Sequence, residues 1–212
     1  MRHSVAAIVL LAVGSLTSCG GDSHQQASAP PSRFVDNRDG TVTDNSTGLT
    51  WEKKTGTLHT GANLLDCSTV CTLGTCEALP CYDPDDVNNA YSWSAGGAAP
   101  DGSVFTVFLP ELNGVLCRAG TTCTGLAGHS DWRLPTISEL QTILDQSGPY
   151  CQNGNPCINS IFGPAAIASG YWSSSTNAFG ADYAWGVGFA VGDVGSSLKS
   201  SLASVRAVRG GS

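Results

Sequence analysis

The chain has 212 residues, of which 41% are hydrophobic and 13% are charged, with 26 glycines and nine cysteines. This composition is typical of a globular protein, and no heptad run, fixed-period repeat or phosphate-binding glycine motif is present. The formal net charge of -7 disfavours nucleic acid, anionic lipid head groups and polyanionic ligands as partners, because each of them needs a basic surface.

The N-terminus resembles the signal peptide of a bacterial lipoprotein. Met1–His3 is a short positive segment, and Val5–Val13 is an apolar run too short to span a bilayer as a permanent helix. Leu16–Cys19 resembles a lipobox, so we expect cleavage before Cys19 and acylation of its thiol, which would anchor the protein stably to a lipid membrane. The alternative is an ordinary secretion signal followed by a buried free thiol. Gly20, where an Asp would favour inner-membrane retention, favours the outer membrane of the cell envelope, facing either the periplasm or the exterior.

Residues 20–32 are small, polar and proline-tipped, which predicts a flexible tether. The expected organisation is therefore a signal peptide at 1–18, a lipidated cysteine with its tether at 19–32, and one domain at 33–212. Without the signal peptide, nine basic residues remain against 17 acidic ones.

The expected domain begins with a β-meander. Phe34–Asn37, Thr41–Asp44 and Leu49–Glu52 are short β-prone runs separated by turn-forming residues. Asp36, Asn37 and Asp39 before Gly40 superficially resemble a calcium loop, but the spacing lacks the first acid and the bidentate glutamate of an EF-hand. We interpret these residues as turn-forming.

Eight cysteines follow Cys19, an even number that an oxidising compartment would convert into four disulfides. Their spacing suggests local pairs, although eight cysteines admit 105 connectivities; the suggested pairs are Cys67 with Cys71, Cys76 with Cys81, Cys117 with Cys123, and Cys151 with Cys157. A zinc site or a redox pair is the functional alternative, and the exported location disfavours it. Asp83, Asp85 and Asp86 form a dense acidic loop, which we interpret as solvated rather than metal-binding.

One helix is predicted in the second half of the chain. Thr136 and Glu139 have the spacing of a capping box, and Ile137, Leu140 and Leu144 then recur on one face until Gly148-Pro149 ends the helix.

Three strand candidates follow this helix: Tyr171–Ser174, Tyr183–Phe189 and Ser204–Arg209. In the middle one, bulky side chains alternate with alanine and glycine. The bulky side should therefore face the core, and the bare side should let another layer approach closely.

Four motifs in order resemble the Lcl C-terminal domain family, named for the end domain of a bacterial collagen-like adhesin. The residues that carry the resemblance, interpreted as structural, are Asp39, Gly40, Thr41, Gly48, Trp51, Asp131, Trp132, Arg133, Leu134, Pro135, Glu139, Tyr171, Trp172, Arg206 and Arg209. The resemblance implies an α+β, C-type-lectin-like domain of short antiparallel strands with one or two helices and disulfide-stapled loops. It also implies an extracytoplasmic binding function, since the named member's domain contributes to adhesion to sulfated glycosaminoglycans.

Transfer of that ligand depends on a basic surface. The acidic balance opposes it unless seven basic residues gather on one face: Arg33, Arg38, Lys53, Lys54, Lys199, Arg206 and Arg209. The chain also lacks a collagen-like repeat, so a trimeric stalk cannot supply avidity. Trp51, Tyr171, Trp172 and Trp185 could stack on sugars, but aromatic residues at alternating strand positions are usually part of the core.

The sequence predicts a non-catalytic binding module that needs no cofactor or metal. His59 and His129 lie in glycine-rich loops without a neighbouring nucleophile motif. The expected partner is a glycan or a cell-envelope protein, with specificity in the long segments Thr55–Cys81 and Ala95–Thr124. The alternatives are a structural lipoprotein that docks an envelope protein, and an enzyme of the formylglycine-generating type, which would need free thiols. The oligomeric state does not follow from the sequence.

Overall fold

The computed structural model describes residues 32–58, 64–67, 81, 83–116, 124–147, 151–167 and 169–211. The signal peptide, Cys19 and the tether up to residue 31 lie outside the described residues, as do Cys71, Cys76, Cys117 and Cys123. The described residues form one compact unit, Ser32–Ser212, that contains all the strands given below.

The two ends of the domain share one antiparallel sheet of four strands, with the order β1-β2-β3-β10. Its strands are β1 (Phe34–Asp36), β2 (Thr41–Asp44), β3 (Leu49–Glu52) and β10 (Val208–Gly210). The predicted meander is therefore confirmed, and β10 pairs with β3 in the register Val208 to Trp51.

The predicted strand Ser204–Arg209 is wrong in its extent. Only Val208–Gly210 pairs with β3, and a separate short strand, β9 (Leu202–Ala203), precedes it. Between them, Ser204 exchanges main-chain hydrogen bonds with Gly170 and Trp172 instead. The Ala207 N–H donates to a Glu52 carboxylate oxygen at 2.7 Å rather than to a main-chain carbonyl.

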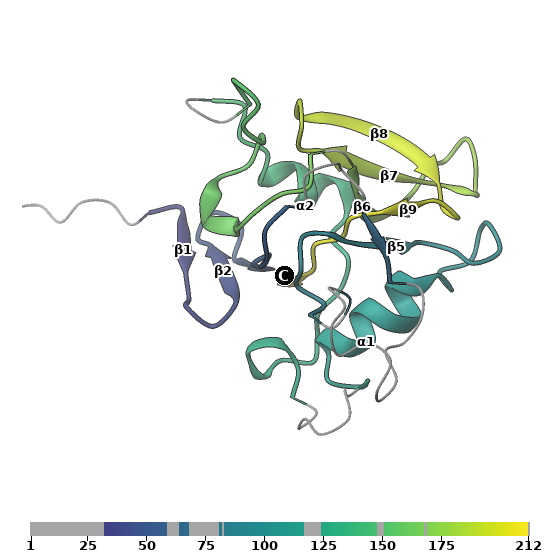
Figure 1. Cartoon of the computed structure of the whole chain (residues 1–212), viewed down its shortest axis with the longest axis horizontal. Helices are drawn as coiled ribbons and strands as arrows, with labels where there is room; N and C mark the ends of the chain where they lie inside the picture. The colour runs from purple at the N-terminus through teal and green to yellow at the C-terminus, as the bar shows by residue number, and fades with distance from the viewer. Residues whose placement is uncertain are drawn as a thin grey trace, which may run out of the picture. The chain divides into compact units, whose positions relative to one another are not determined.

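Two further three-stranded sheets complete the described part. In the first, β5 (Asn89–Ser92) pairs in parallel with β4 (Leu65–Asp66) and antiparallel with β9. In the second, β7 (Tyr183–Gly188) lies between β6 (Gly170–Thr176) and β8 (Asp193–Leu198), both antiparallel to it. Figure 1 shows β8 at the outer edge of this sheet.

The predicted helix is present as α2 (Ile137–Thr142), and its capping box between Thr136 and Glu139 is confirmed. The helix ends earlier than the predicted stop at Gly148-Pro149. Ile143 leaves helical geometry, and Leu144 instead forms a bridge with Ile158. Because this bridge already places the Leu144 side chain against the core, the helix does not need another turn to bury it.

A second helical segment was not predicted. A π-helical stretch, η2 (Val104–Phe108), continues into α1 (Leu109–Leu112), inside the segment expected to be a specificity loop. Val104, Val107, Phe108 and Leu112 are buried, so this segment is core structure. Two single-turn 3-10 helices, η3 (Leu126–Gly128) and η4 (Ser160–Phe162), lie in the loops.

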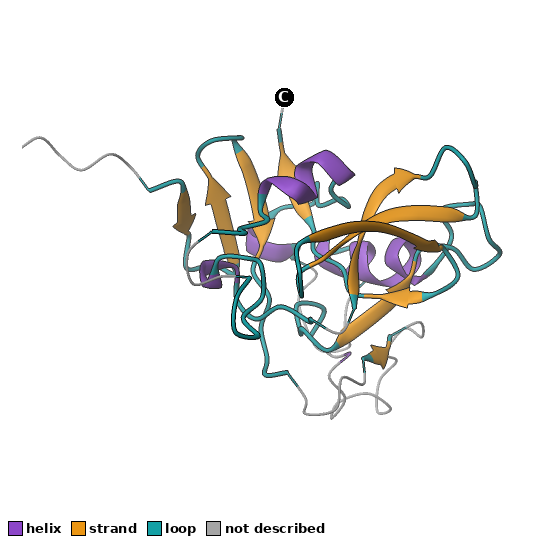
Figure 2. Cartoon of the chain, turned by 90° about the horizontal axis from the view of Figure 1, so that it is seen from above, coloured by secondary structure: helices purple, strands orange, loops and turns teal. Residues whose placement is uncertain are grey.

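Two hydrophobic clusters meet at β6. Tyr171 packs into the first cluster, with Val187, Phe189 and the apolar face of α2, whereas Trp172 packs into the second cluster, with the residues of η2 and α1. Successive residues of a strand point to opposite faces of the sheet, so this Tyr-Trp pair connects the two clusters. In Figure 2 helical segments lie in the middle of the domain, with strands on both sides of them.

The mixture of short sheets and few helices is an α+β arrangement. Among the described residues, no helix has the length and apolar character that crossing a bilayer requires.

Candidate functional site

The turn between β1 and β2 is built by its acidic residues. The Asp36 carboxylate accepts from the Arg38 N–H at 2.9 Å, and Asp39 accepts from the N–H and hydroxyl of Thr41 at 3.1 and 2.6 Å. Gly40 has a φ of +88°, which favours glycine. The interpretation of these acids as turn-forming is confirmed.

Arg133 connects the start of α2 to the C-terminal strand. It forms two hydrogen bonds with the Glu139 carboxylate, at 2.8 and 2.7 Å, and a third with the Gly210 carbonyl at 3.2 Å. The Arg133 guanidinium and the Thr136 N–H hold the pKa of Glu139 down at about 2. Asp131 pairs instead with Arg209, at 2.8 Å. These motif residues hold the fold together.

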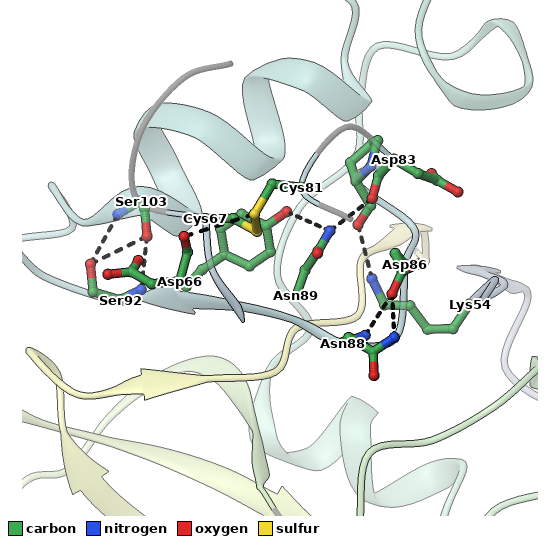
Figure 3. The surroundings of a disulfide bond; sticks show 12 residues. Lys54, Asp66, Cys67, Cys81, Asp83, Asp86, Asn88, Asn89, Ser92 and Ser103 are labelled. Atoms are coloured by element: carbon green, nitrogen blue, oxygen red, sulfur yellow. Dashed lines mark hydrogen bonds between the residues drawn. A yellow bond between two sulfur atoms is a disulfide. The ribbon is translucent and has the colours of Figure 1, made fainter. Parts of the chain in front are cut away.

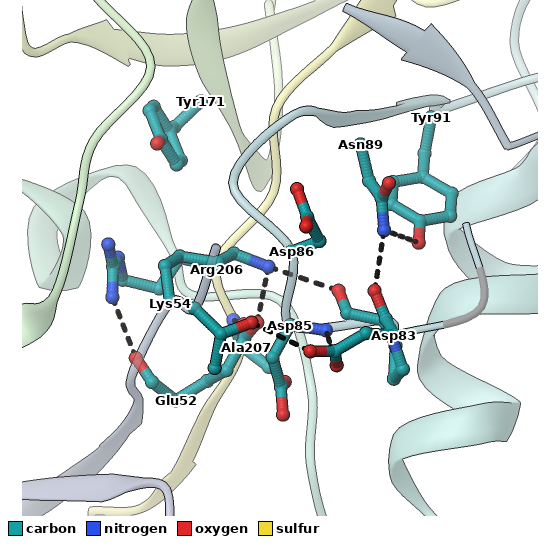
Figure 4. Close-up of polar contacts among 12 residues, drawn as sticks. Glu52, Lys54, Asp83, Asp85, Asp86, Asn89, Tyr91, Tyr171, Arg206 and Ala207 are labelled. Atoms are coloured by element: carbon teal, nitrogen blue, oxygen red, sulfur yellow. Dashed lines mark hydrogen bonds and ion pairs between the residues drawn. The ribbon is translucent and has the colours of Figure 1, made fainter. Parts of the chain in front are cut away.

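A cluster of buried charges lies where β3 meets the C-terminal segment (Figure 4). Arg206 is fully buried and donates to the main-chain carbonyls of Glu52 and Phe162, at 2.7 and 2.9 Å. The Glu52 carboxylate accepts from the Ala207 N–H and pairs with the Lys54 ammonium, which also donates to the Pro84 carbonyl. Each side chain of this cluster thus connects segments that are distant in the sequence.

The acidic loop before β5 is half-buried beside this cluster, and Asp85 is its most enclosed acid. Burial raises the pKa of the Asp85 carboxyl well above its usual range, and the neighbouring negative charge of Glu52 raises it further. Asp83 accepts from the Asp85 N–H and the Thr55 hydroxyl, at 3.0 and 2.7 Å, and Asp86 accepts from the Asn88 N–H at 2.8 Å. The interpretation of a solvated loop therefore needs correction only for Asp85, which has a buried carboxylate oxygen, whereas Asp83 and Asp86 are partly exposed and shape the loop through their hydrogen bonds.

Metal binding is not supported by the described side chains. Within the ranges that the structure describes, no group of three or more His, Cys, Asp and Glu residues could hold a metal ion. Lys54 and Arg206 already supply positive charge beside Glu52.

The disulfides differ in part from the local pairs suggested by spacing. Cys151–Cys157 is present as predicted, whereas Cys67 pairs with Cys81, 14 residues later, which excludes the pairs Cys67–Cys71 and Cys76–Cys81. Figure 3 shows the Cys67–Cys81 bond beside Asn89, whose amide donates to the Asp83 carbonyl at 2.7 Å. This disulfide joins the residue after β4 to Cys81, which lies two positions before Asp83. The predicted Cys117–Cys123 pair lies outside the described residues.

The basic residues that the structure describes do not gather into a patch. Five basic side chains form ion pairs with separate acids: Arg33 with Asp44, Lys53 with Asp36, Lys54 with Glu52, Arg133 with Glu139, and Arg209 with Asp131. Arg206 and Lys199 are buried. Of the basic residues that the structure describes, Arg38 alone is exposed without an ion pair. Such a surface gives a sulfated polymer no cluster of cations to bind.

Lys199 is held inside the protein by an aromatic ring. Its ammonium lies 3.8 Å from the centre of the Trp93 ring and donates to the Ala98 carbonyl and the Thr176 hydroxyl, both at 3.0 Å. Burial lowers the pKa of this lysine. The contacts fasten the glycine-rich loop before η2 to the end of β8.

The aromatic residues of the motifs are core residues. Trp51, Tyr171 and Trp172 are buried, and the Trp172 indole N–H donates to the Tyr91 carbonyl at 2.9 Å. On β7 the prediction of a bulky core side is confirmed for Val187 but not for Tyr183, which is 37% exposed. Trp185 is half-buried between them.

An open hollow of about 400 Å³ lies on the opposite, bare side of the same sheet. Its floor is formed by four glycines of β6, β7 and β8: Gly170, Gly186, Gly188 and Gly195. A Cβ atom on Gly186 would lie 2.7 Å from the Tyr171 carbonyl oxygen, so a larger residue cannot occupy that floor position. The glycine pattern therefore creates the hollow.

The walls of the hollow combine apolar and hydroxyl-bearing side chains. Ile167, Val191 and Leu202 are exposed at its margin, and Ser169, Ser197 and Ser201 line it. Among the described residues that line it, Asp193 is the one carboxylate and none is basic. Hydroxyl and carboxylate groups beside small apolar surfaces suit the hydroxyl and C–H faces of a sugar.

Sequence reasoning found the glycine side of β7 but not the hollow. The alternation of Ala184, Gly186 and Gly188 signals a bare face. Whether another layer covers this face depends on the pairing with β8 and on the position of Leu202, which no local pattern encodes. Ala184 is covered by the second cluster, whereas Gly186 and Gly188 remain open.

Comparison with protein-family models identifies the domain type. The family model described as Lcl C-terminal domain matches residues 40–209, most of the chain. A search of curated proteins gave no significant match.

Proposed function

The chain belongs to the Lcl C-terminal domain family, and on that basis we propose that it is a non-catalytic, C-type-lectin-like binding protein of the bacterial cell envelope. The hollow on the β6–β7–β8 sheet is its proposed ligand site, and a glycan of a surface partner is the proposed ligand. The family match supports the domain type, and the hollow supports the placement of the site.

The chemistry of the hollow favours a neutral or amine-bearing glycan. A sulfated chain needs several free cations, whereas the described lining of the hollow contains a carboxylate and no basic group. The hollow lies at the small end of the usual range for ligand sites, of roughly 300 to 1,000 Å³, so one or two sugar rings would fit. This chemistry is the observation that carries the proposal.

A non-catalytic role is supported by the structural contacts that occupy the buried charged side chains and the described cysteines. Glu52, Lys54 and Arg206 are buried in contacts that connect strands, away from the hollow. The four described cysteines are disulfide-bonded, whereas an enzyme of the formylglycine-generating type would need free thiols.

The proposed location follows from the lipobox-like segment at Leu16–Cys19. Acylation of Cys19 would anchor the protein, with the outer membrane favoured, and the tether would let the domain reach ligands away from the lipid surface. Disulfides in the folded domain agree with an oxidising compartment.

A glycan array probed with the soluble fragment 33–212 tests the ligand, with and without calcium. We expect binding to neutral or amine-bearing glycans that does not depend on calcium and weak or no binding to sulfated ones. No binding to any glycan would remove the glycan from the proposal, and preferential binding to sulfated chains would contradict the assignment of the hollow.

A further inference from the structure

The outer edge of β8 has unpaired main-chain groups. The antiparallel register places Tyr183 opposite Leu198, and the Lys199 N–H donates to the Asp182 carbonyl at 2.8 Å. In an antiparallel ladder this pattern alternates, so Gly195 and Ser197 bond to β7. The N–H and C=O groups of the residues between them point outward, away from β7; these residues are Val194, Ser196 and Leu198. In the described part of the chain no strand pairs with this edge.

This edge lacks the features that usually prevent strands from associating. From Val194 to Leu198 there is no proline and no charged residue, and the register with β7 contains no bulge. Val194 and Leu198 are 38% and 42% exposed. Natural proteins usually protect such an edge with lysine, proline, a bulge or a covering segment, because it is a template for another strand. The edge therefore has the properties of an interface.

We propose that β8 pairs with β8 of a second copy of this chain, across a two-fold axis at Ser196. An antiparallel register centred there is the one that pairs all three outward-facing residues. Ser196 faces the partner's Ser196, and Val194 faces the partner's Leu198. About six main-chain hydrogen bonds form, two for each facing pair. The two sheets become one continuous sheet of six strands.

The edge is complementary to itself in side chains as well as in backbone. Two exposed apolar residues cover each other on the same face, and cross-strand apolar pairs of this kind stabilise antiparallel sheets. Asp193 of one copy lies opposite the partner's Lys199, whose side chain is buried within its own copy, so the two Asp193 carboxylates do not face each other and no like charges meet. The matching backbone register and apolar contacts identify a second copy as the occupant, since a two-fold interface requires that one surface fit itself.

The pairing has a consequence for binding that rests on the proposed function. Directly opposed residues in an antiparallel pair lie on the same face of a sheet, so both hollows face the same side of the dimer. Two sites held together raise the avidity for a repetitive surface through effective concentration. The dimer would thus supply the multivalency that a collagen-like stalk supplies elsewhere, and its loss would leave the binding by a single hollow intact.

Two cysteine variants of the compact unit 32–212 test the register. In S196C the two thiols would face each other across the axis, at a Cα separation of about 5.5 Å that suits a disulfide. In the matched variant S197C the side chains project from the other face of the sheet and lie opposite Gly195 of the partner chain. After mild oxidation we expect a covalent dimer on a non-reducing gel at least tenfold more abundant for S196C than for S197C. Equal yields would overturn the register.

Sedimentation equilibrium tests the dimer itself. We expect the wild-type fragment to dimerise with rising concentration and V194K to remain monomeric, because the lysine places a charge on the edge. The control V35K introduces the same change at a residue of β1 that is 40% exposed, and it should dimerise like the wild type. A wild-type fragment that stays monomeric at its highest soluble concentration would overturn the proposal. Glycan binding by V194K, measured in parallel, separates failure of the dimer from failure of the ligand site.

Discussion

The Arg206 guanidinium donates to the main-chain carbonyl of Glu52 at 2.7 Å, across 154 residues of sequence. The Glu52 carboxylate in turn accepts from the N–H of Ala207, the residue after Arg206. This reciprocal contact closes the domain by holding its C-terminal segment against β3. It also explains why a charged residue from the family motif is fully buried.

Replacement of Arg206 should therefore destabilise the fold strongly. R206A removes the donor for two buried carbonyls and leaves a cavity, which should lower the free energy of unfolding by about 3 kcal/mol or more. R209A removes an exposed ion pair and should cost at most about 1 kcal/mol. Urea unfolding of both variants checks the contrast, and equal losses would show that the buried contact does not close the domain.

The raised pKa of Asp85 predicts a pH-dependent effect of its own. A carboxyl whose folded pKa lies above its unfolded value stabilises the fold fully at low pH, and this contribution is lost as the pH rises through the folded pKa. D85N keeps the shape and stays neutral, so it should be more stable than the wild type at pH 8 and about equal to it at pH 4. The matched control is D182N, which makes the same substitution at an exposed carboxylate. Thermal unfolding across this range measures the difference, and a D85N variant less stable than the wild type at pH 8 would contradict the argument.

Glu139 should show the opposite pH dependence. Hydrogen bonds from Arg133 hold the pKa of Glu139 at about 2, so its contribution is present above pH 5 and lost as the pH falls toward 2. The Arg133 side chain is 41% exposed, so solvent screening reduces the expected effect to about 1 kcal/mol. The stability difference between the wild type and E139Q should shrink on acidification. A constant difference from pH 6 to pH 3 would show that the ion pair is not its source.

The two disulfides should contribute unequally to the free energy of unfolding. In the chain-entropy model a longer loop gives more stabilisation, so removal of Cys67–Cys81 should cost about 3 kcal/mol and removal of Cys151–Cys157 about 2 kcal/mol. Double serine variants measured by equilibrium urea unfolding give both values. A larger loss for the shorter loop would indicate that packing around Cys157, which is fully buried, dominates over loop closure.

The sequence predicts the local elements of this domain better than its long-range pairings. The meander and the capping box at Thr136 depend on residues that are close together in the sequence, so local propensities are enough to predict them. The Cys67–Cys81 disulfide was missed because the spacing of cysteines in the sequence does not show which of them lie close together in the fold. The burial of Asp85 was missed because it depends on Glu52, Lys54 and Tyr91 from other strands.

The helical segment at 104–112 shows the same limit. Val104, Phe108 and Leu112 recur every four residues, a helical spacing, but the glycine and serine before them and Pro110 within the run are typical of a loop. Packing of this face against Trp132 and Trp172 overrides these local preferences. The hollow likewise arises from tertiary structure, since its floor and margin come from separate strands and loops.

Filling the hollow tests the central claim most directly. Gly195 lines the hollow, and a Cβ atom there would meet no other atom within 4 Å, so G195W should fold and occupy the space that a sugar would take. The matched control is G96W, at a glycine outside the hollow with equally open surroundings. With the strongest ligand from the glycan array, isothermal titration should show at least tenfold weaker binding for G195W and unchanged binding for G96W. Unchanged binding by a correctly folded G195W would place the ligand site elsewhere and contradict the account.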